Sequence, residues 1–535
     1  MPPSRDPVPA ATRAWLAEAG PSGLRHALAE AFGDAQARWR HTGLPLFDPA
    51  FRRGPPLPAI ADPAAVYAAL HPARRATGAY YTPDAVVDEV VALTWDGASA
   101  VLDPAVGAGA FLLGALRALP TDRRAAFATT HLEGVDLDPL AVMLAQARIA
   151  EFAGLGAAGC AALAARVRVG DSLRAPPATA ETVLTNPPFL NRLHTLAAPE
   201  PALAAAIRVR HGDRVGPYTD VSVIFLLDAL RAARRAVGIV LPASVCATRD
   251  AAAARTEAGP PTAAWTLPPR SFADVAVPLV ALVFSADKPS ATRRFAGLPP
   301  AGLPSAAPDA AWNTLLAAPD AAPWVPPDGG PTLGSVARVE ADFRDEYYAS
   351  RGRVAEDGPG LRLITSGNIA LGRLEWGVTP VRLHKARWTK PTVPPDALHP
   401  RQAARLGPAI FVATQTRLLE AAADPSGRCV AVTPVLTVVP GSWALVDLLA
   451  VLLSPPASAW AQARGLGSAL GLGVTKLSAG QLRELPLPPV VPEAARAAAE
   501  RVAAGDDAAI DELAAAMNDA WGAPPALLEW WRARR

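Results

Sequence analysis

A chain of 535 residues can hold two or three domains, each with its own apolar core, which excludes a single small domain. Apolar residues make up 51% of it, but the longest apolar run, at 430–446, contains two prolines and a glycine that a membrane-spanning helix rarely combines. We therefore expect a soluble protein without a membrane partner. The net charge of +2 neither predicts nor excludes an anionic partner, because proteins with nearly equal numbers of acidic and basic residues bind such partners through local patches.

The first residues contain no apolar segment of signal-peptide length. The three cysteines lie far apart, without the spacing of a metal site. They are Cys160, Cys246 and Cys429. Both observations predict a cytoplasmic protein with reduced thiols and no metal.

The first 75 residues are predicted to form an N-terminal helical segment, with helices near 10–32 and 64–70. At 76–290, short β-rich runs alternate with Ala-rich helical stretches. The runs lie at 100–103, 131–136, 165–169, 182–185, 238–242 and 279–284. This alternation predicts parallel βαβ units with helices on both faces of one sheet, and the last run is interpreted as an antiparallel edge strand.

A Pro/Ala-rich stretch at 291–335 is interpreted as a linker. Short strands and turns mix in the following region, 336–490. The last region, 491–535, is predicted to be helical. The chain is therefore expected to have a second domain beyond the α/β region.

A glycine-containing turn follows the first run and opens a helix, with the sequence Asp103-Pro-Ala-Val-Gly107-Ala-Gly109. Glycines let the backbone approach a ligand at the carboxyl end of a strand, which favours a cofactor loop. The same turn can be purely structural, and its spacing differs from the GxGxxG of dinucleotide-binding proteins.

Two further carboxylates follow the next two runs. Asp136 ends the second run, where a carboxylate can accept hydrogen bonds from both ribose hydroxyls. Asp171 follows the third run, where a carboxylate can accept one from the amine of an adenine ring. Each could alone be a turn residue or a helix cap, and Asp138 is interpreted as the N-cap of the next helix. Three such loops on one edge of a sheet together favour a cofactor site.

The most informative motif is Asn186-Pro187-Pro188-Phe189, after the fourth run. A nucleobase amine is a poor nucleophile, because its lone pair is delocalised into the ring. To attack a sulfonium methyl group it needs acceptors for both N–H groups, and the Asn186 side-chain oxygen and the Pro187 carbonyl can supply them. The prolines make the loop rigid, and Phe189 can stack on the base. A Pro-rich loop without function is the alternative.

Upstream, Gly78-Ala-Tyr-Tyr81-Thr82-Pro83 precedes a predicted helix. Thr82 is a typical N-cap and Pro83 suits the first helical position, so the motif can be a simple helix start. A helix N-terminus also suits an anion such as the carboxylate of a methionine moiety.

The motifs GAYYTP, DPAVGAGAF, GVDLDP, GDS and NPPF, in this order over 78–189, resemble those of gamma-class DNA adenine-N6 methyltransferases of restriction-modification and phage-defence systems. The resemblance extends more weakly to about residue 286. It implies an α/β fold, with a Rossmann-like class I S-adenosylmethionine-dependent methyltransferase domain and a mostly parallel seven-stranded sheet. An α+β target-recognition domain is expected to follow. Val106 stands where many relatives have cysteine, but this position supplies backbone, so activity is still expected.

The resemblance implies S-adenosyl-L-methionine as the cofactor, without a metal, and N6 of adenine in double-stranded DNA as the methyl acceptor, reached by base flipping. A separate restriction or defence subunit is a further expected partner. The cofactor-binding residues implied are Tyr81, Thr82, Asp103, Gly107, Asp136 and Asp171. The adenine pocket implied consists of Asn186, Pro187 and Phe189.

The region 336–490 resembles target-recognition domains faintly. From Arg362 to Arg428, ten basic residues stand against four acidic ones, with Trp376 and Trp388 among them. Such an excess favours contacts with DNA phosphates, and a solvated basic face without function is the alternative.

Other methyltransferases also use NPPF or NPPY loops, so cytosine N4, guanine N2 of ribosomal RNA and glutamine of release factors are alternative acceptors. A non-catalytic DNA-binding subunit is another alternative. A common nuclease core needs Asp/Glu-x-Lys, and none of the four lysines has an acidic residue two positions upstream, so no DNA cleavage is expected. These lysines are Lys288, Lys385, Lys390 and Lys476.

Overall fold

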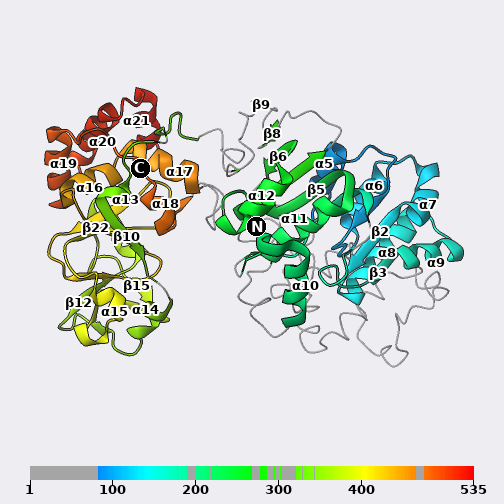
Figure 1. Cartoon of the computed structure of the whole chain (residues 1–535), viewed down its shortest axis with the longest axis horizontal. Helices are drawn as coiled ribbons and strands as arrows, with labels where there is room; N and C mark the ends of the chain where they lie inside the picture. The colour runs from blue at the N-terminus through cyan, green and yellow to red at the C-terminus, as the bar shows by residue number, and fades with distance from the viewer. Residues whose placement is uncertain are drawn as a thin grey trace, which may run out of the picture. The chain divides into compact units, whose positions relative to one another are not determined.

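A computed structural model of the chain describes residues 82–176, 179–189, 201–216, 219–267, 278–285, 293–295, 301–302, 312, 321–327, 329–342, 344–465 and 475–535 (Figure 1). The expected N-terminal helices, Tyr81 and much of the expected linker lie outside these residues. Two compact units, Met1–Leu316 and Ala317–Arg535, make up the chain. The finer division into five ranges stays a prediction.

The first unit is built around a nine-stranded sheet with the strand order β3-β2-β1-β4-β5-β7-β6-β8-β9. Neighbouring strands from β3 to β5 are parallel, whereas β7 is antiparallel to β5 and to β6. The mostly parallel α/β sheet is therefore confirmed, with β8 and β9 in addition to the seven strands expected. The strands are β1 (Val101–Asp103), β2 (Leu132–Asp136), β3 (Val167–Val169), β4 (Ala180–Thr185), β5 (Ala233–Pro242), β6 (Ala263–Thr266), β7 (Leu279–Ser285), β8 (Arg293–Phe295) and β9 (Ala301–Gly302).

Two details of the sheet differ from the sequence interpretation. The run at 279–284 is antiparallel, as expected, but it is not an edge strand, because β7 lies between β5 and β6. The strand that displaces it from the edge, β6, was missed. Its four residues, Ala-Ala-Trp-Thr, are too few to show alternation, and the two alanines have low strand propensity.

Helices cover both faces of this sheet, as expected, because successive strand residues point to opposite sides. Val101 and Leu184 belong to the core formed with α5–α9, while their neighbours Leu102 and Val183 belong to the core formed with α10–α12. The first group is α5 (Asp84–Thr94), α6 (Ala110–Arg117), α7 (Thr121–Thr130), α8 (Pro139–Ala153) and α9 (Ala157–Arg166). The second group is α10 (Pro201–His211), α11 (Val221–Ala232) and α12 (Ala252–Ala258).

The second unit mixes small sheets with helices. Strands β10, β22, β18 and β20 form one antiparallel sheet, and β11, β17, β12 and β21 form a mixed one. Two-stranded pairs are β13–β14, β15–β16 and β19–β23. Strand bounds are β10 (Ala337–Ala341), β11 (Ala355–Glu356), β12 (Leu361–Ile364), β13 (Ile369–Ala370), β14 (Arg373–Leu374), β15 (Val381–Leu383), β16 (Ala386–Trp388), β17 (Pro391–Val393), β18 (Ala409–Val412), β19 (Gln415–Thr416), β20 (Ala421–Asp424), β21 (Cys429–Ala431), β22 (Leu436–Pro440) and β23 (Thr475–Lys476).

The largest core of the second unit joins its first sheet to its C-terminal helices. Val339 and Ile410 on strands share this core with Trp460, Leu513 and Trp531 on helices. The regions 336–490 and 491–535 are therefore packed together. Helices of this unit are α13 (Leu333–Val336), α14 (Arg344–Ala349), α15 (Pro400–Ala403), α16 (Leu445–Leu452), α17 (Pro455–Gly465), α18 (Ala479–Arg483), α19 (Glu493–Ala503), α20 (Ala509–Ala520) and α21 (Pro525–Arg532).

Within the described residues, a single helix with the length and apolar character needed to cross a membrane is not found. One pair, α16 and α17, passes that test together by length and composition, with a bend of 61° between the two helices.

Candidate active site

Four loops of the first unit meet at one edge of the sheet, because β1 to β4 run parallel and end on the same side. Asp103 and Asp136 are the last residues of β1 and β2. Asp171 and Asn186 follow β3 and β4 within two residues. The motifs identified in the sequence are thus brought together at the carboxyl ends of the strands, where open α/β sheets bind their ligands.

The glycine loop after β1 depends on backbone conformations that other residues rarely adopt. Gly107 and Gly109 have φ values of +50° and +83°. A Cβ on Gly109 would stand 3.1 Å from the Cα atom of Ala145, so this glycine lets the loop approach α8 closely. Apart from its two chain neighbours, no described residue has an atom within 4 Å of the place where a Cβ on Gly107 would stand, so the loop borders open space there.

The carboxylate of Asp136 is held in place by two backbone N–H groups. Gly107 N donates to its Oδ2 at 2.8 Å, and Asp138 N donates to its Oδ1 at 2.9 Å. Burial raises the pKa of this carboxyl above its ordinary value, and these two hydrogen bonds oppose the shift. Asp138 directly precedes α8, and its carbonyl accepts from Val142 N at 3.1 Å, in agreement with the predicted N-cap position.

Asp103 lies beneath the glycine loop and only 1% of it is exposed. Its Oδ1 accepts a hydrogen bond from Ala105 N at 3.0 Å, and the nearby Thr185 side chain on β4 favours its ionised form. Burial raises the pKa of Asp103 to about 7, and the neighbouring negative charge of Asp136 adds to this shift. The side chain thus joins β1 to the loop that follows it.

The loop after β3 is tied to the glycine loop by Ser172, whose Oγ donates to the carbonyl of Pro104 at 2.7 Å. Sequence reasoning missed this residue, because only the carboxylate of the GDS motif was considered. Asp171 accepts a hydrogen bond from Leu173 N at 2.9 Å and forms an ion pair with Arg174 at 3.2 Å. It is therefore a turn residue whose other carboxylate oxygen already has a cationic neighbour.

A hydrogen bond joins the NPPF loop to the segment before α5. The amide Nδ2 of Asn186 donates to Oγ1 of Thr82 at 2.8 Å, and Thr82 is 3% exposed. The prediction that Thr82 caps α5 is wrong: the N-cap is Pro83, whose carbonyl accepts from Val86 N and Val87 N, and the first helical residue is Asp84. The Thr82 hydroxyl contacts a residue 104 positions away instead of its own helix.

The rest of the NPPF loop is partly enclosed. Pro187 is buried, and Phe189 is half-buried against the core that includes α5–α9. Tyr81 lies outside the described residues. Among the residues that the structure describes, no group of three or more His, Cys, Asp or Glu side chains could hold a metal ion.

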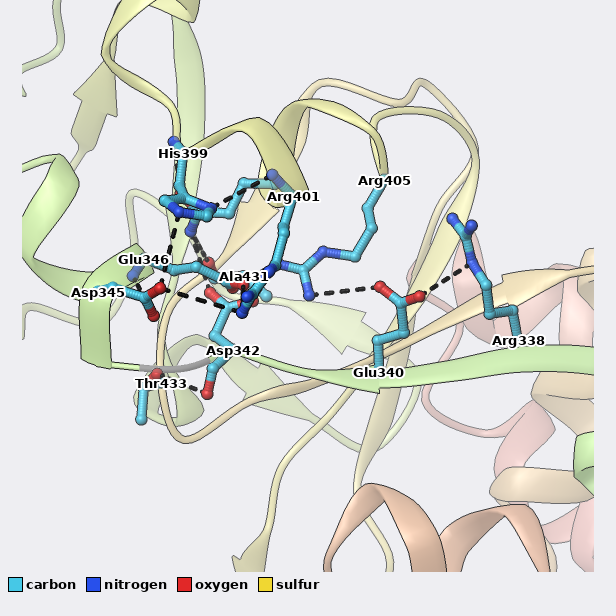
Figure 2. Close-up of polar contacts among 11 residues, drawn as sticks. Arg338, Glu340, Asp342, Asp345, Glu346, His399, Arg401, Arg405, Ala431 and Thr433 are labelled. Atoms are coloured by element: carbon cyan, nitrogen blue, oxygen red, sulfur yellow. Dashed lines mark hydrogen bonds and ion pairs between the residues drawn. The ribbon is translucent and has the colours of Figure 1, made fainter.

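In the second unit, acidic partners neutralise several of the basic residues between Arg362 and Arg428. Arg405 is 7% exposed at its side chain and donates to Asp342 at 2.7 Å and to Glu346 at 2.6 Å (Figure 2). Burial raises the pKa of Asp342 to about 7, while the Arg405 charge opposes that shift. Further ion pairs are Arg373–Asp507, Lys390–Asp357 and Arg401–Asp345.

The two tryptophans of this region, Trp376 and Trp388, make hydrogen bonds within the unit. Trp376 Nε1 donates to the Pro391 carbonyl at 3.0 Å, and the guanidinium of Arg362 lies 4.7 Å from its ring centre. Trp388 Nε1 donates to the Leu383 carbonyl at 3.2 Å. The basic excess counted in the sequence is therefore not one continuous surface.

Comparison with known proteins finds a family model that matches most of the first unit. The sequence model of the family described as N-6 DNA Methylase matches residues 67–294. No protein with curated function matches the chain.

Two solved structures share the fold along most of the chain. The type IIL restriction-modification enzyme MmeI in complex with DNA is 12% identical, with a TM-score of 0.53, over 96% of this chain and 89% of that one. A DrdV–DNA complex is 12% identical, with a TM-score of 0.52, over 90% of this chain and 66% of that one.

A modification subunit of a putative type I restriction enzyme from Vibrio vulnificus YJ016 is 20% identical, with a TM-score of 0.33, over 43% of this chain. This match spans 50% of that subunit's length. The family match, together with the sheet order and the strand-end motifs that it covers, assigns an N-6 DNA methylase domain to residues 67–294.

Proposed function

We propose that the chain transfers the methyl group of S-adenosyl-L-methionine to N6 of adenine in double-stranded DNA, as a cytoplasmic modification component of a restriction-modification or related defence system. The observation that carries this proposal is the 2.8 Å hydrogen bond from Asn186 to Thr82, which connects the NPPF loop with the motif before the sheet. The family match over residues 67–294 and the likeness in fold to two DNA-bound proteins support it.

The edge of the sheet fits the cofactor. Space is open beside Gly107, and Asp136 ends β2 with a carboxylate oriented by two N–H groups, where ribose hydroxyls can donate to it. Asp171 follows β3, on the side expected for the adenine ring of the cofactor. When bound here, S-adenosylmethionine supplies an electrophilic methyl group on a sulfonium. Because Asp103 is buried, we assign it the role of holding the glycine loop in shape.

Asn186 and Pro187 are proposed to hold the amine of the target adenine. Because Asn186 Nδ2 donates to Thr82, the side-chain oxygen lies at the opposite end of the amide and can accept one N6–H group. The carbonyl of Pro187 can accept the other. Two fixed acceptors draw the nitrogen lone pair out of conjugation with the ring, and a rigid loop supplies them without reorganisation during the reaction.

The target base is proposed to leave the double helix before it reacts. N6 of a stacked and paired adenine cannot reach a loop at the end of a sheet, so the nucleotide must be flipped out, at a cost of a few kcal/mol. Phe189, half-buried beside Asn186, can stack on the flipped base. We expect positioning and hydrogen bonds to provide most of the rate enhancement.

The test is methyl transfer from labelled S-adenosylmethionine to unmethylated duplex DNA, followed by mass spectrometry of the nucleosides. We expect N6-methyladenine with the natural chain and with Glu181→Ala, a substitution near the other end of the same strand, β4. Asn186→Ala should lose the product while retaining cofactor binding and thermal stability. N4-methylcytosine would change the proposed base, and label found only in RNA or protein would contradict DNA as the substrate.

The defence role has a separate test. A modification component leaves the cleavage of foreign DNA to another subunit, so the purified chain should not cut unmethylated DNA. Strand breaks produced by the chain alone, and absent after prior methylation, would contradict the modification-only role.

A further inference from the structure

The β15–β16 hairpin of the second unit has a turn of only two residues, His384 and Lys385. Their φ values are 51° and 68°, in the left-handed region that such turns require and that glycine and asparagine usually occupy. Neither residue is of these types, so the turn is strained and must be held by its surroundings.

Helix α14 and the residue after it hold this turn in place. The Tyr347 hydroxyl accepts a hydrogen bond from His384 N at 2.9 Å, and the two rings lie 4.4 Å apart. Ser350 Oγ lies 3.0 Å from Nε2 of His384. Burial and the charge of Arg351 lower the pKa of His384, so its ring is neutral at pH 7. The hairpin is therefore braced at its turn, and its positive charge comes from other side chains.

Three of these side chains are exposed on the hairpin itself. Arg382 and Arg387 are directly opposite each other on the two strands, and Lys385 stands at the turn. Like charges at directly opposite positions destabilise a strand pair. In the part of the chain that the structure describes, no carboxylate forms an ion pair with any of the three. Two other basic residues of the same basic stretch, Lys390 and Arg405, do form ion pairs with carboxylates.

Two residues beside the hairpin extend this surface. Arg351 is exposed and lies close enough to His384 to shift its pKa. Tyr348 is 56% exposed, and its ring packs edge-on against Tyr347 at 5.2 Å. We call Tyr348, Arg351, Arg382, Lys385 and Arg387 the hairpin surface. It combines one exposed aromatic ring with four cations for which the described residues supply no acidic partner.

We propose that this hairpin enters the major groove of the DNA substrate, with Arg351, Arg382 and Arg387 on phosphates and Lys385 at the leading end. The inference rests on the proposed function, because it names the element that holds the duplex. A two-stranded ribbon fits the width of a major groove. DNA phosphates supply the negative charge that the described part of the chain does not place beside the opposed arginines. The brace from Tyr347 keeps the ribbon in shape before DNA binds, which limits the entropy lost on binding.

The test is the salt dependence of DNA binding by the full chain, measured by fluorescence anisotropy with a labelled duplex in about 50 to 200 mM salt. Each phosphate contact contributes about 0.9 to the slope of log K against log salt concentration. The double variant Arg382→Gln and Arg387→Gln should therefore lower this slope by about 1.8 and weaken binding. Removing opposed like charges should not unfold the hairpin, which a thermal melt will check.

A matched control removes the same number of arginines elsewhere in the unit. Arg501 and Arg532 are also partly exposed, but each pairs with carboxylates, at 2.6 Å with Asp506 and at 2.8 Å with Glu529. They lie on α19 and α21, at the end of the unit away from α14 and β15 (Figure 1). The control pair Arg501→Gln and Arg532→Gln should keep the natural slope.

The outcomes separate this inference from the proposed function. Unchanged slope and affinity in the hairpin variant would overturn the inference, even if the chain methylates adenine. An equal loss of slope in the control pair would also overturn it, because net charge alone would explain the effect. A chain whose binding depends on the hairpin, yet which methylates no DNA, would contradict the proposed function and leave the hairpin assignment supported.

Discussion

Replacing Thr82 by valine removes the oxygen that holds the Asn186 amide while nearly preserving the shape of the side chain. Thr82 is 3% exposed, and its Oγ1 accepts from Asn186 Nδ2 at 2.8 Å. Without this oxygen, the N–H group loses its partner at a cost of about 1–3 kcal/mol, and the amide is no longer held in one orientation. At about 1.36 kcal/mol for each tenfold change in rate, methyl transfer should slow by roughly 5- to 150-fold.

The assay separates the two roles that Thr82 could have. If it positions Asn186, Thr82→Val lowers kcat and leaves the KM for S-adenosylmethionine unchanged, because only the acceptor loop is affected. If it contacts the cofactor directly, KM rises. Thr82→Ser keeps the hydroxyl and is the matched control, with an expected rate close to that of the natural chain.

A double-mutant cycle completes this test. In an Asn186→Ala background the valine substitution should cause no further loss of thermal stability, because the interaction that it removes no longer exists. A stably folded Thr82→Val protein with the natural kcat would refute the reasoning. So would effects of the two substitutions on the free energy of unfolding that simply add.

Three further outcomes are expected. Gly109→Ala should raise the KM for S-adenosylmethionine in steady-state kinetics, because its Cβ would crowd Ala145. It should also destabilise the fold by more than the approximately 1–2 kcal/mol of left-handed strain. Gly154→Ala, with φ +65° and open space, should cost only that strain and leave KM unchanged. Burial raises the pKa of Asp103 from 3.8 to about 7, so the folded state keeps a proton that the unfolded state loses. The free energy of unfolding should therefore fall by up to about 4 kcal/mol as pH rises from about 4 to 7. Asp103→Asn should abolish that part of the pH dependence in urea unfolding; an unchanged curve would show that Asp103 does not titrate in this window. Arg405→Ala should lower the free energy of unfolding by about 3–5 kcal/mol, because it leaves two buried carboxylates uncompensated. Arg353→Ala breaks an exposed pair with Asp396 and should have little effect; equal losses would contradict this account.

Local sequence pattern was sufficient to predict the first unit's main elements and the edge where its motifs meet. The runs that end at Asp103 and Asp136 are apolar enough to be buried strands, and the stretches between them have helical length. Parallel strands all end on one side of their sheet. Loops that follow successive strands must therefore come together, so the meeting of Asp136 with the glycine loop could be expected from spacing alone.

The choice of partners was decided only by the tertiary structure. Thr82 has the chemistry of an N-cap, yet the N-cap is Pro83, and folding brings Asn186 within 2.8 Å of the Thr82 hydroxyl. Arg405 and Arg382 belong to one basic stretch, but packing buries the first between Asp342 and Glu346 and leaves the second exposed. Periodicity depends on neighbours in the chain, whereas a hydrogen bond or an ion pair depends on which groups distant in sequence approach within about 3 Å and lose water together.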